Sequence, residues 1–64
     1  MTYTGCFLEI IEGEEIFSRM EYEVGGDIVT DAMDKEAIDY FMKHRREGEY
    51  LTDVYDSNGV NILS

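Results

Sequence analysis

The residues that most often perform chemistry in proteins are scarce in this chain. It has one cysteine, Cys6, and one histidine, His44. A zinc site needs several such ligands, so it cannot be built from this pair, and a Cys–His nucleophile pair has no supporting sequence signature here. Cys6 lies in an apolar run, which predicts a buried, unreactive thiol; a reactive or dimer-linking thiol is the alternative.

Carboxylates are abundant, but they do not form a metal motif. The segment 56–59, Asp-Ser-Asn-Gly, is similar to part of a calcium-binding loop. Aligning Asn58 and Gly59 with that loop puts Val54 at its first position, where an aspartate is required. Paired carboxylates can also serve acid–base catalysis, but a chain of 64 residues offers little room for a ligand cleft. We therefore predict no metal, no cofactor and no enzymatic activity.

A β-hairpin is predicted at the start of the chain. Residues 3–12 and 15–24 are rich in β-branched and aromatic side chains, and Glu-Gly-Glu at 12–14 is typical of a turn between two strands. Side chains alternate between the two faces of a strand, so one face of each strand is expected to join the core. The residues expected in the core are Cys6, Leu8, Ile10, Ile16, Met20, Tyr22 and Val24. Those expected to point outward are Phe7, Glu9, Ile11, Phe17, Arg19, Glu21 and Glu23.

One helix is predicted over residues 34–47. Asp34 is a suitable N-cap, and Thr30 is an alternative cap that would start the helix about a turn earlier. Gly48 suits the position that follows the last helical turn. The apolar stripe expected to face the sheet consists of Ala37, Ile38, Phe41 and Met42.

Two more strands are predicted after the helix. Residues 49–56 favour a third strand, and Asn58-Gly59 is a strong hairpin signal that leads to a short fourth strand at 60–63. The order of elements is then β-β-α-β-β. The simplest architecture is a single α+β domain over residues 1–64, in which an antiparallel sheet of three to four strands has one helix packed on one face.

The negative charge is unevenly distributed along the chain. The net charge is −10, from 15 acidic and 5 basic residues, and residues 34–47 contain as many acids as bases. The excess acid therefore belongs to the strands, turns and loops. Such a chain is not expected to bind nucleic acid or an anionic membrane directly. Its apolar stretches are too short to span a membrane and residues 1–4 lack the basic start of a signal peptide, so we expect a cytoplasmic protein (in the host cell cytoplasm if it is viral).

The acidic surface has two interpretations: it keeps the protein soluble, or it binds a strongly basic protein groove. Residues i and i+2 of a strand lie about 6.6 Å apart, which is close to two phosphate steps of about 3.4 Å along a DNA strand. Glu21 and Glu23 form such a pair, and Glu9 is expected beside them across the hairpin. The predicted partner-binding residues are Glu9, Glu12, Glu14, Glu15, Glu21, Glu23, Asp27, Phe7 and Phe17.

In size, net charge, absence of catalytic motifs and expected α+β fold, the chain resembles the small acidic inhibitors of phages and mobile elements. Anti-CRISPR proteins and anti-restriction proteins that mimic nucleic acids are examples. These proteins share no sequence motif, so the resemblance assigns no role to any residue. It implies a stoichiometric inhibitor that blocks the nucleic-acid-binding surface of a basic host protein such as a CRISPR effector.

The alternative is a small interaction or assembly module without mimicry, such as a homodimer. Three apolar residues expected among the outward acids, Phe7, Ile11 and Phe17, would form the seam between two copies. A basic cluster at 43–46 is expected to complement the helix dipole at the end of the helix. Binding of an acidic partner by this cluster is the competing interpretation.

Overall fold

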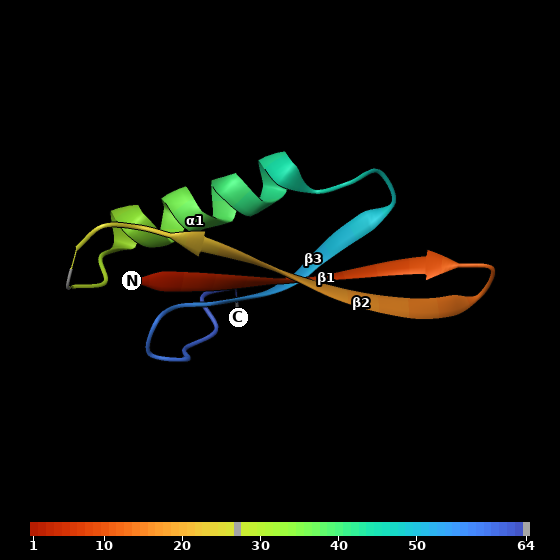
Figure 1. Ribbon diagram of the computed structural model, residues 1–64, viewed down its shortest axis with the longest axis horizontal. Coiled ribbons are helices and arrows are strands. Elements are labelled where there is room, and N and C mark those ends of the chain that lie inside the picture. Colours follow the sequence, from red (N-terminus) through yellow and green to blue (C-terminus); the bar gives the residue numbers. More distant parts are fainter. Residues whose placement is uncertain (27, 64) are drawn as a thin grey trace.

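A three-stranded antiparallel sheet and one helix make up the fold, as seen in a computed structural model that describes residues 1–26 and 28–63 (Figure 1). The elements in chain order are β1 (Thr2–Ile11), β2 (Glu14–Glu23), α1 (Asp31–His44) and β3 (Glu49–Tyr55). The strand order is β2-β1-β3, so β1 is central and β2 and β3 form the two edges. The predicted α+β class, with an antiparallel sheet and one helix, is confirmed. The predicted fourth strand at 60–63 is not formed: that stretch makes one isolated bridge, between Asn61 and Tyr55.

The predicted hairpin is confirmed, and its turn has two residues. Glu12 and Gly13 both have positive φ, 52° and 83°, which is the backbone of the tight turns whose twist matches that of the flanking strands. From this turn, β1 and β2 pair in one uninterrupted register, from Ile11 opposite Glu14 to Thr2 opposite Glu23.

The prediction of which β1 side chains face the core is wrong. Tyr3, Gly5 and Phe7 lie on the inner face of the sheet, the face that holds the core, and Phe7 is only 2 % exposed. Ile10, which was expected inside, is 58 % exposed. Both alternate sets of β1 residues are largely apolar, so the alternation alone could not decide between them.

The predicted inner face of β2 is confirmed only for the half of the strand near the core. Met20 and Tyr22 pack against the core. Ile16 shares their face but is 45 % exposed, because it lies on the part of the hairpin beyond the core.

The helix begins and ends earlier than predicted. Its N-cap is Thr30, the alternative cap, whose side-chain oxygen accepts a hydrogen bond from the Met33 backbone N–H at 3.2 Å. Asp34 lies in the first turn, where it accepts a hydrogen bond from the Tyr3 hydroxyl at 2.7 Å. The helix ends at His44, so Gly48 is not its C′ residue; it adopts φ 88° in the turn before β3.

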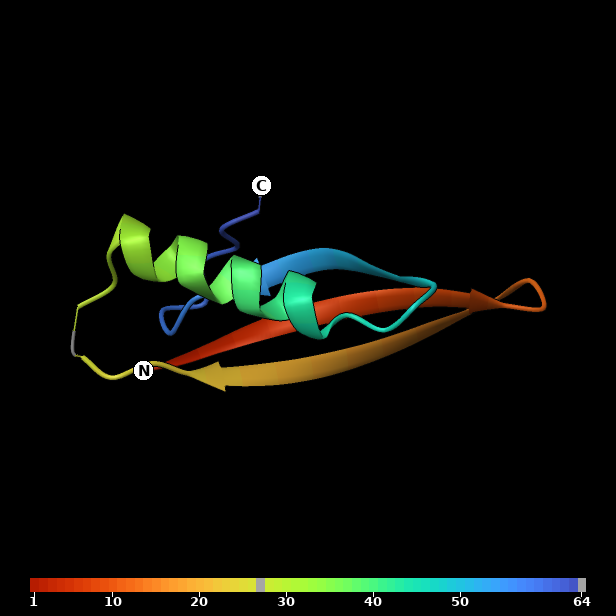
Figure 2. The ribbon, with the colours of Figure 1, turned by 90° about the horizontal axis from the view of Figure 1, so that it is seen from above.

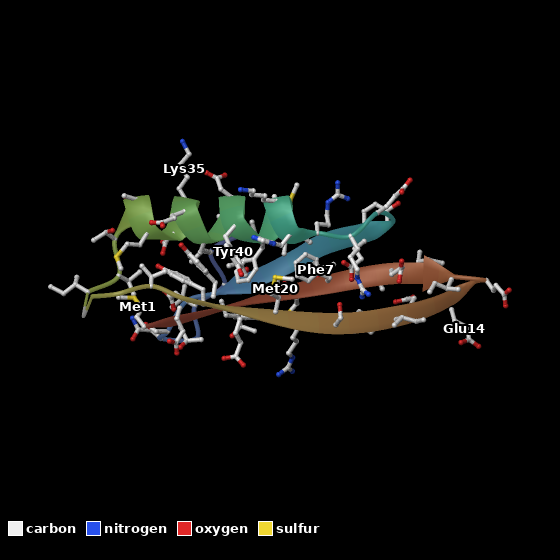
Figure 3. The ribbon with its side chains drawn as sticks, turned by 45° about the horizontal axis from the view of Figure 1, so that its top comes forward. Met1, Phe7, Glu14, Met20, Lys35 and Tyr40 are labelled. Atoms are coloured by element: carbon white, nitrogen blue, oxygen red, sulfur yellow. The ribbon has the colours of Figure 1, made fainter. Side chains whose placement is uncertain are left out.

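Within residues 1–26 and 28–63, the core consists of five buried hydrophobic residues. They are Tyr3, Phe7, Ala37, Phe41 and Val54, drawn from both the sheet and the helix. Figure 3 shows Phe7 and Met20 between the sheet and α1. Gly5 of β1 lies directly against the Phe41 ring of α1: a Cβ atom at position 5 would be 2.7 Å from Cγ of Phe41.

The hairpin formed by β1 and β2 extends past the end of α1. The molecule measures 42 × 20 × 17 Å, and Figures 1 and 2 show the hairpin tip standing clear of the helix. The apolar residues on this extension are all exposed: Ile10, Ile11, Ile16 and Phe17. We call residues 10–17 the hairpin arm.

Replacing Gly5 by alanine tests the contact on which this core depends. We expect Gly5→Ala to lower the free energy of unfolding by about 1–3 kcal/mol, because the added methyl group overlaps the Phe41 ring. The control is Gly25→Ala, where an added Cβ meets no atom within 4 Å; it should leave stability unchanged within about 0.5 kcal/mol. Urea unfolding followed by circular dichroism measures both. Equal stability of the two variants would contradict the contact.

Candidate protein-binding surface

The face of the sheet opposite the core forms the most distinctive surface of the described chain. We call it the open face. Alternation and register place on it Thr2, Thr4, Cys6, Leu8 and Ile10 of β1, Glu15, Phe17, Arg19, Glu21 and Glu23 of β2, and Tyr50, Asp53 and Tyr55 of β3. Cys6 lies here half-buried, so the prediction of a buried thiol in the core is wrong.

An apolar row crosses the open face from edge to edge. Leu8 lies opposite Phe17 on one side and opposite Tyr50 on the other. Phe17 is 69 % exposed and Tyr50 is 61 % exposed. Ile10 follows Leu8 on the same face of β1. Large apolar and aromatic side chains exposed together are typical of protein-binding surfaces.

Carboxylates lie on both sides of this apolar row along β2. Glu15 lies beyond Phe17 toward the hairpin tip, and Glu21 and Glu23 lie toward the other end of the strand; all three are exposed. Arg19, between Phe17 and Glu21, is the one cationic side chain among the described residues of the open face. The open face of β2 is therefore a mixed strip of acid, aromatic and arginine.

The residues predicted to bind a partner lie in several different parts of the structure. Glu12, Glu14 and Glu15 lie at the tip of the hairpin, where Figure 3 labels Glu14. Glu21 and Glu23 lie on the open face nearer the core, with Phe17 between the two groups. Asp27 lies outside the described residues.

Two of the predicted partner-binding residues are not where the sequence placed them. Phe7 is buried in the core and cannot contact a partner. Glu9 lies opposite Ile16 on the inner face, and its carboxylate approaches Gly48. It is therefore not beside Glu21 and Glu23, because the face assignment of β1 was inverted.

Several other acids hold the fold together. Glu49, 4 % exposed, forms an ion pair with Arg46 at 3.3 Å and accepts hydrogen bonds from the Arg46 backbone N–H and the Ser18 hydroxyl. The Arg46 guanidinium also donates hydrogen bonds to both Glu49 carboxylate oxygens, and these, together with the bond from the Arg46 backbone N–H, lower the pKa of Glu49. Asp56 accepts hydrogen bonds from the backbone N–H groups of Asn58 and Val60. These carboxylates are structural and do not belong to the candidate surface.

Two tyrosines on the inner face bind acids of the helix. Burial and the hydrogen bond to Asp34 raise the pKa of Tyr3 to about 12. The Tyr22 hydroxyl donates to Glu36 at 2.8 Å, and this hydrogen bond raises the pKa of Tyr22. The Tyr22 ring also stacks on Tyr40, with ring centroids 4.1 Å apart.

The predicted basic cluster at 43–46 is partly used within the fold. Besides the ion pair of Arg46, the Arg45 guanidinium donates to the Glu49 carbonyl at 2.6 Å. The His44 ring lies against Tyr40, with centroids 4.3 Å apart. Lys43 and His44 occupy the last helical turn, where the charge of Lys43 suits the helix dipole.

An open hollow of about 650 Å³ adjoins the open face. It is lined by Thr2, Thr4, Cys6, Arg19 and Tyr55 together with Asp56, Ser57 and Gly59 of the following turn.

Within the described ranges, no group of three histidine, cysteine, aspartate or glutamate residues is placed to hold a metal ion. Among the same residues, no helix is long and apolar enough to cross a membrane.

Sequence reasoning missed several parts of the candidate surface. Leu8 was assigned to the core, and Tyr50 and the turn at 56–59 were not assigned to any surface. Tyr50 could have been found from its neighbours, since it alternates with the inward Leu51 on β3.

Comparison with protein-family models, curated proteins and solved structures found no match to this chain.

The ion pair between Arg46 and Glu49 predicts how stability depends on pH. Because the pKa of folded Glu49 is lowered from its ordinary value of 4.5, the charged carboxylate stabilises the fold above that pH. This stabilisation is lost as the pH falls through the lower folded value. We expect Glu49→Gln to lower the melting temperature by several degrees at neutral pH, and the difference from wild type to shrink in acid.

Thermal unfolding of both proteins, followed by circular dichroism over a series of acidic and neutral pH values, measures this difference. Glu47→Gln is the control, because Glu47 is exposed in the same connection. A difference between wild type and Glu49→Gln that stays constant with pH would show that the ion pair does not form.

Proposed function

We propose that this chain is a non-catalytic acidic binding protein that inhibits a basic host protein. The partner is a nucleic-acid-binding protein such as a CRISPR effector, and the chain comes from a phage or mobile element. One observation supports this above all: in the described chain, exposed carboxylates of β2 share the open face of the sheet with an exposed apolar row and a single arginine. Charge guides the encounter with a basic surface, and aromatic side chains supply most of the binding energy.

The positions of the acids fit a row of phosphates in part. Glu21 and Glu23 are two residues apart on one face, about 6.6 Å along the strand. Glu15 lies a further six residues from Glu21, about 20 Å away. The spacing between Glu15 and Glu21 is therefore about six phosphate steps. Phe17 and Arg19 interrupt the row, so the surface combines charge mimicry with ordinary apolar contact.

Reversal of the two neighbouring charges tests this proposal. We expect Glu21→Lys combined with Glu23→Lys to slow association with a purified apo CRISPR effector by about tenfold or more, because it removes charge from the contact itself. The control combines Asp39→Lys with Glu47→Lys, which changes the net charge equally at exposed positions off the sheet. Surface plasmon resonance at roughly 50 and 200 mM salt gives the rates, and wild-type binding should weaken steeply between them.

Two results would contradict the proposal. One is binding that does not depend on salt. The other is an equal loss of association rate in the two double variants, which would show that only total charge matters and not the open face.

A homodimeric module is the second candidate, and the apolar row of Leu8, Phe17 and Tyr50 favours it. The two candidates respond to salt in opposite directions. Two copies of net charge −10 repel each other, so screening should strengthen a homodimer and weaken binding to a basic partner.

Sedimentation velocity at low and high salt separates these candidates. We expect a monomer at both salt concentrations if the open face binds a basic protein. A dimer that strengthens with salt and dissociates on Phe17→Ser would instead establish the assembly module. Phe17→Ser should not unfold the protein, because Phe17 is 69 % exposed.

A further inference from the structure

The outer edge of β2 has unpaired backbone groups along its length. In an antiparallel pair, opposed residues alternate between those that exchange backbone hydrogen bonds and those that do not. Met1 and Val24 exchange two backbone hydrogen bonds, each of 2.9 Å, so this pair is of the hydrogen-bonded kind and every second pair along the hairpin is of the same kind. The even-numbered residues of β2 therefore bond to β1. The odd-numbered residues direct their N–H and C=O groups away from the sheet; they are Glu15, Phe17, Arg19, Glu21 and Glu23.

This edge lacks three features that protect natural sheet edges from strand addition: proline, lysine and β-bulges. Its charged side chains are a fourth such feature, and they oppose only an added strand of like charge. β2 contains no proline and no lysine, and its ten-residue register with β1 has no bulge. The β3 edge differs: its pairing with β1 is irregular next to Cys6, and the following chain pairs with it through Ile62 and Asn61. Of the two edges in the described chain, β2 is the open one.

The residues with outward backbone groups are the same ones whose side chains lie on the open face. A strand added to β2 would therefore place its alternate side chains beside Glu15, Phe17, Arg19, Glu21 and Glu23. Because β2 contains four glutamates and one arginine, a second copy of β2 would bring like charges together. A segment with lysine or arginine at alternate positions would meet opposite charges.

We propose that the β2 edge binds an extended, basic segment of the partner protein as a fourth strand. This inference rests on the proposed function and specifies how the partner is held. Backbone hydrogen bonds along the edge hold the segment, as in other cases of strand addition. Side-chain pairing selects its sequence: cations opposite the three glutamates, an apolar residue opposite Phe17, and a polar residue opposite Arg19. The three glutamates are Glu15, Glu21 and Glu23.

The test uses a synthetic peptide with this pattern, Lys-Thr-Lys-Thr-Thr-Thr-Leu-Thr-Lys, which pairs antiparallel with residues 23 to 15. A peptide of the same composition, with the lysines and leucine moved off the alternate positions, is the control. Amide hydrogen exchange of the wild-type protein, measured by NMR with each peptide, reports the docking mode directly. The patterned peptide should slow exchange at Phe17, Arg19 and Glu21 by about tenfold or more. Exchange at Ser18 and Met20, already bonded to β1, should change little.

A pair of variants separates backbone from side-chain contributions. Arg19→Pro removes an outward N–H, and Arg19→Ala changes the charge equally but keeps that N–H. Proline is tolerated on an edge strand where its nitrogen faces solvent. We expect Arg19→Pro to weaken binding of the patterned peptide at least tenfold relative to Arg19→Ala. The exchange measurement needs no variant, so the proposal stays testable if Arg19→Pro fails to fold.

Three results would overturn the inference. The first is no binding of the patterned peptide. The second is equal binding of the two peptides without protection of the odd-numbered amides, which would mean that charge alone attracts basic chains. The third is a dimer whose odd-numbered β2 amides are already protected without peptide. The proposed function is judged separately, by salt-dependent association with an intact basic protein, so strand addition can fail while the inhibitor proposal stands.

Discussion

The close approach of the Phe41 ring to Gly5 is the contact on which the rest of the molecule depends. A Cβ atom at position 5 would lie 2.7 Å from the ring, so the ring fits here only over glycine. Tyr3 and Phe7 lie two residues to either side of Gly5 on β1 and therefore face the same core. This contact decides which alternate set of β1 side chains is inside. Leu8 lies on the open face as a consequence.

The small size of the core explains why apolar side chains remain exposed. A chain of 64 residues can bury only a modest core, and here it ends near Phe7 and Phe41. The hairpin arm at 10–17 continues without cover on either face, and an isolated hairpin is marginally stable in water. Exposed Ile10, Ile16 and Phe17 do not contribute to the buried core. Their exposure on the arm supports the proposed contact with a partner protein.

The sequence was sufficient to predict the helix and the first three strands, but not the faces, and the fourth strand predicted at 60–63 forms only an isolated bridge. Strong local signals marked the hairpin, the helix and the third strand, because turn residues and periodicity act over a few positions. β1 has apolar residues in both alternate sets, so the choice between Phe7 and Leu8 required knowledge of the helix that packs over Gly5. The start of the helix was similarly ambiguous, since Thr30 and Asp34 both suit an N-cap. In the structure Asp34 instead accepts a hydrogen bond from Tyr3. Local sequence patterns cannot predict this contact, because the two residues are far apart in the chain.

Arg19 helps to distinguish two ways in which β2 could bind a partner, phosphate mimicry and strand addition. In a surface that only mimics phosphates, a guanidinium among the carboxylates would weaken binding, because the cation would repel a basic groove. Strand addition removes this conflict. Backbone hydrogen bonds form regardless of the side chain at position 19, and a polar residue opposite Arg19 would satisfy it. The acids, Phe17 and Arg19 then become alternate positions of one recognition strip, in which the order of charges selects a partner segment and the backbone edge holds it.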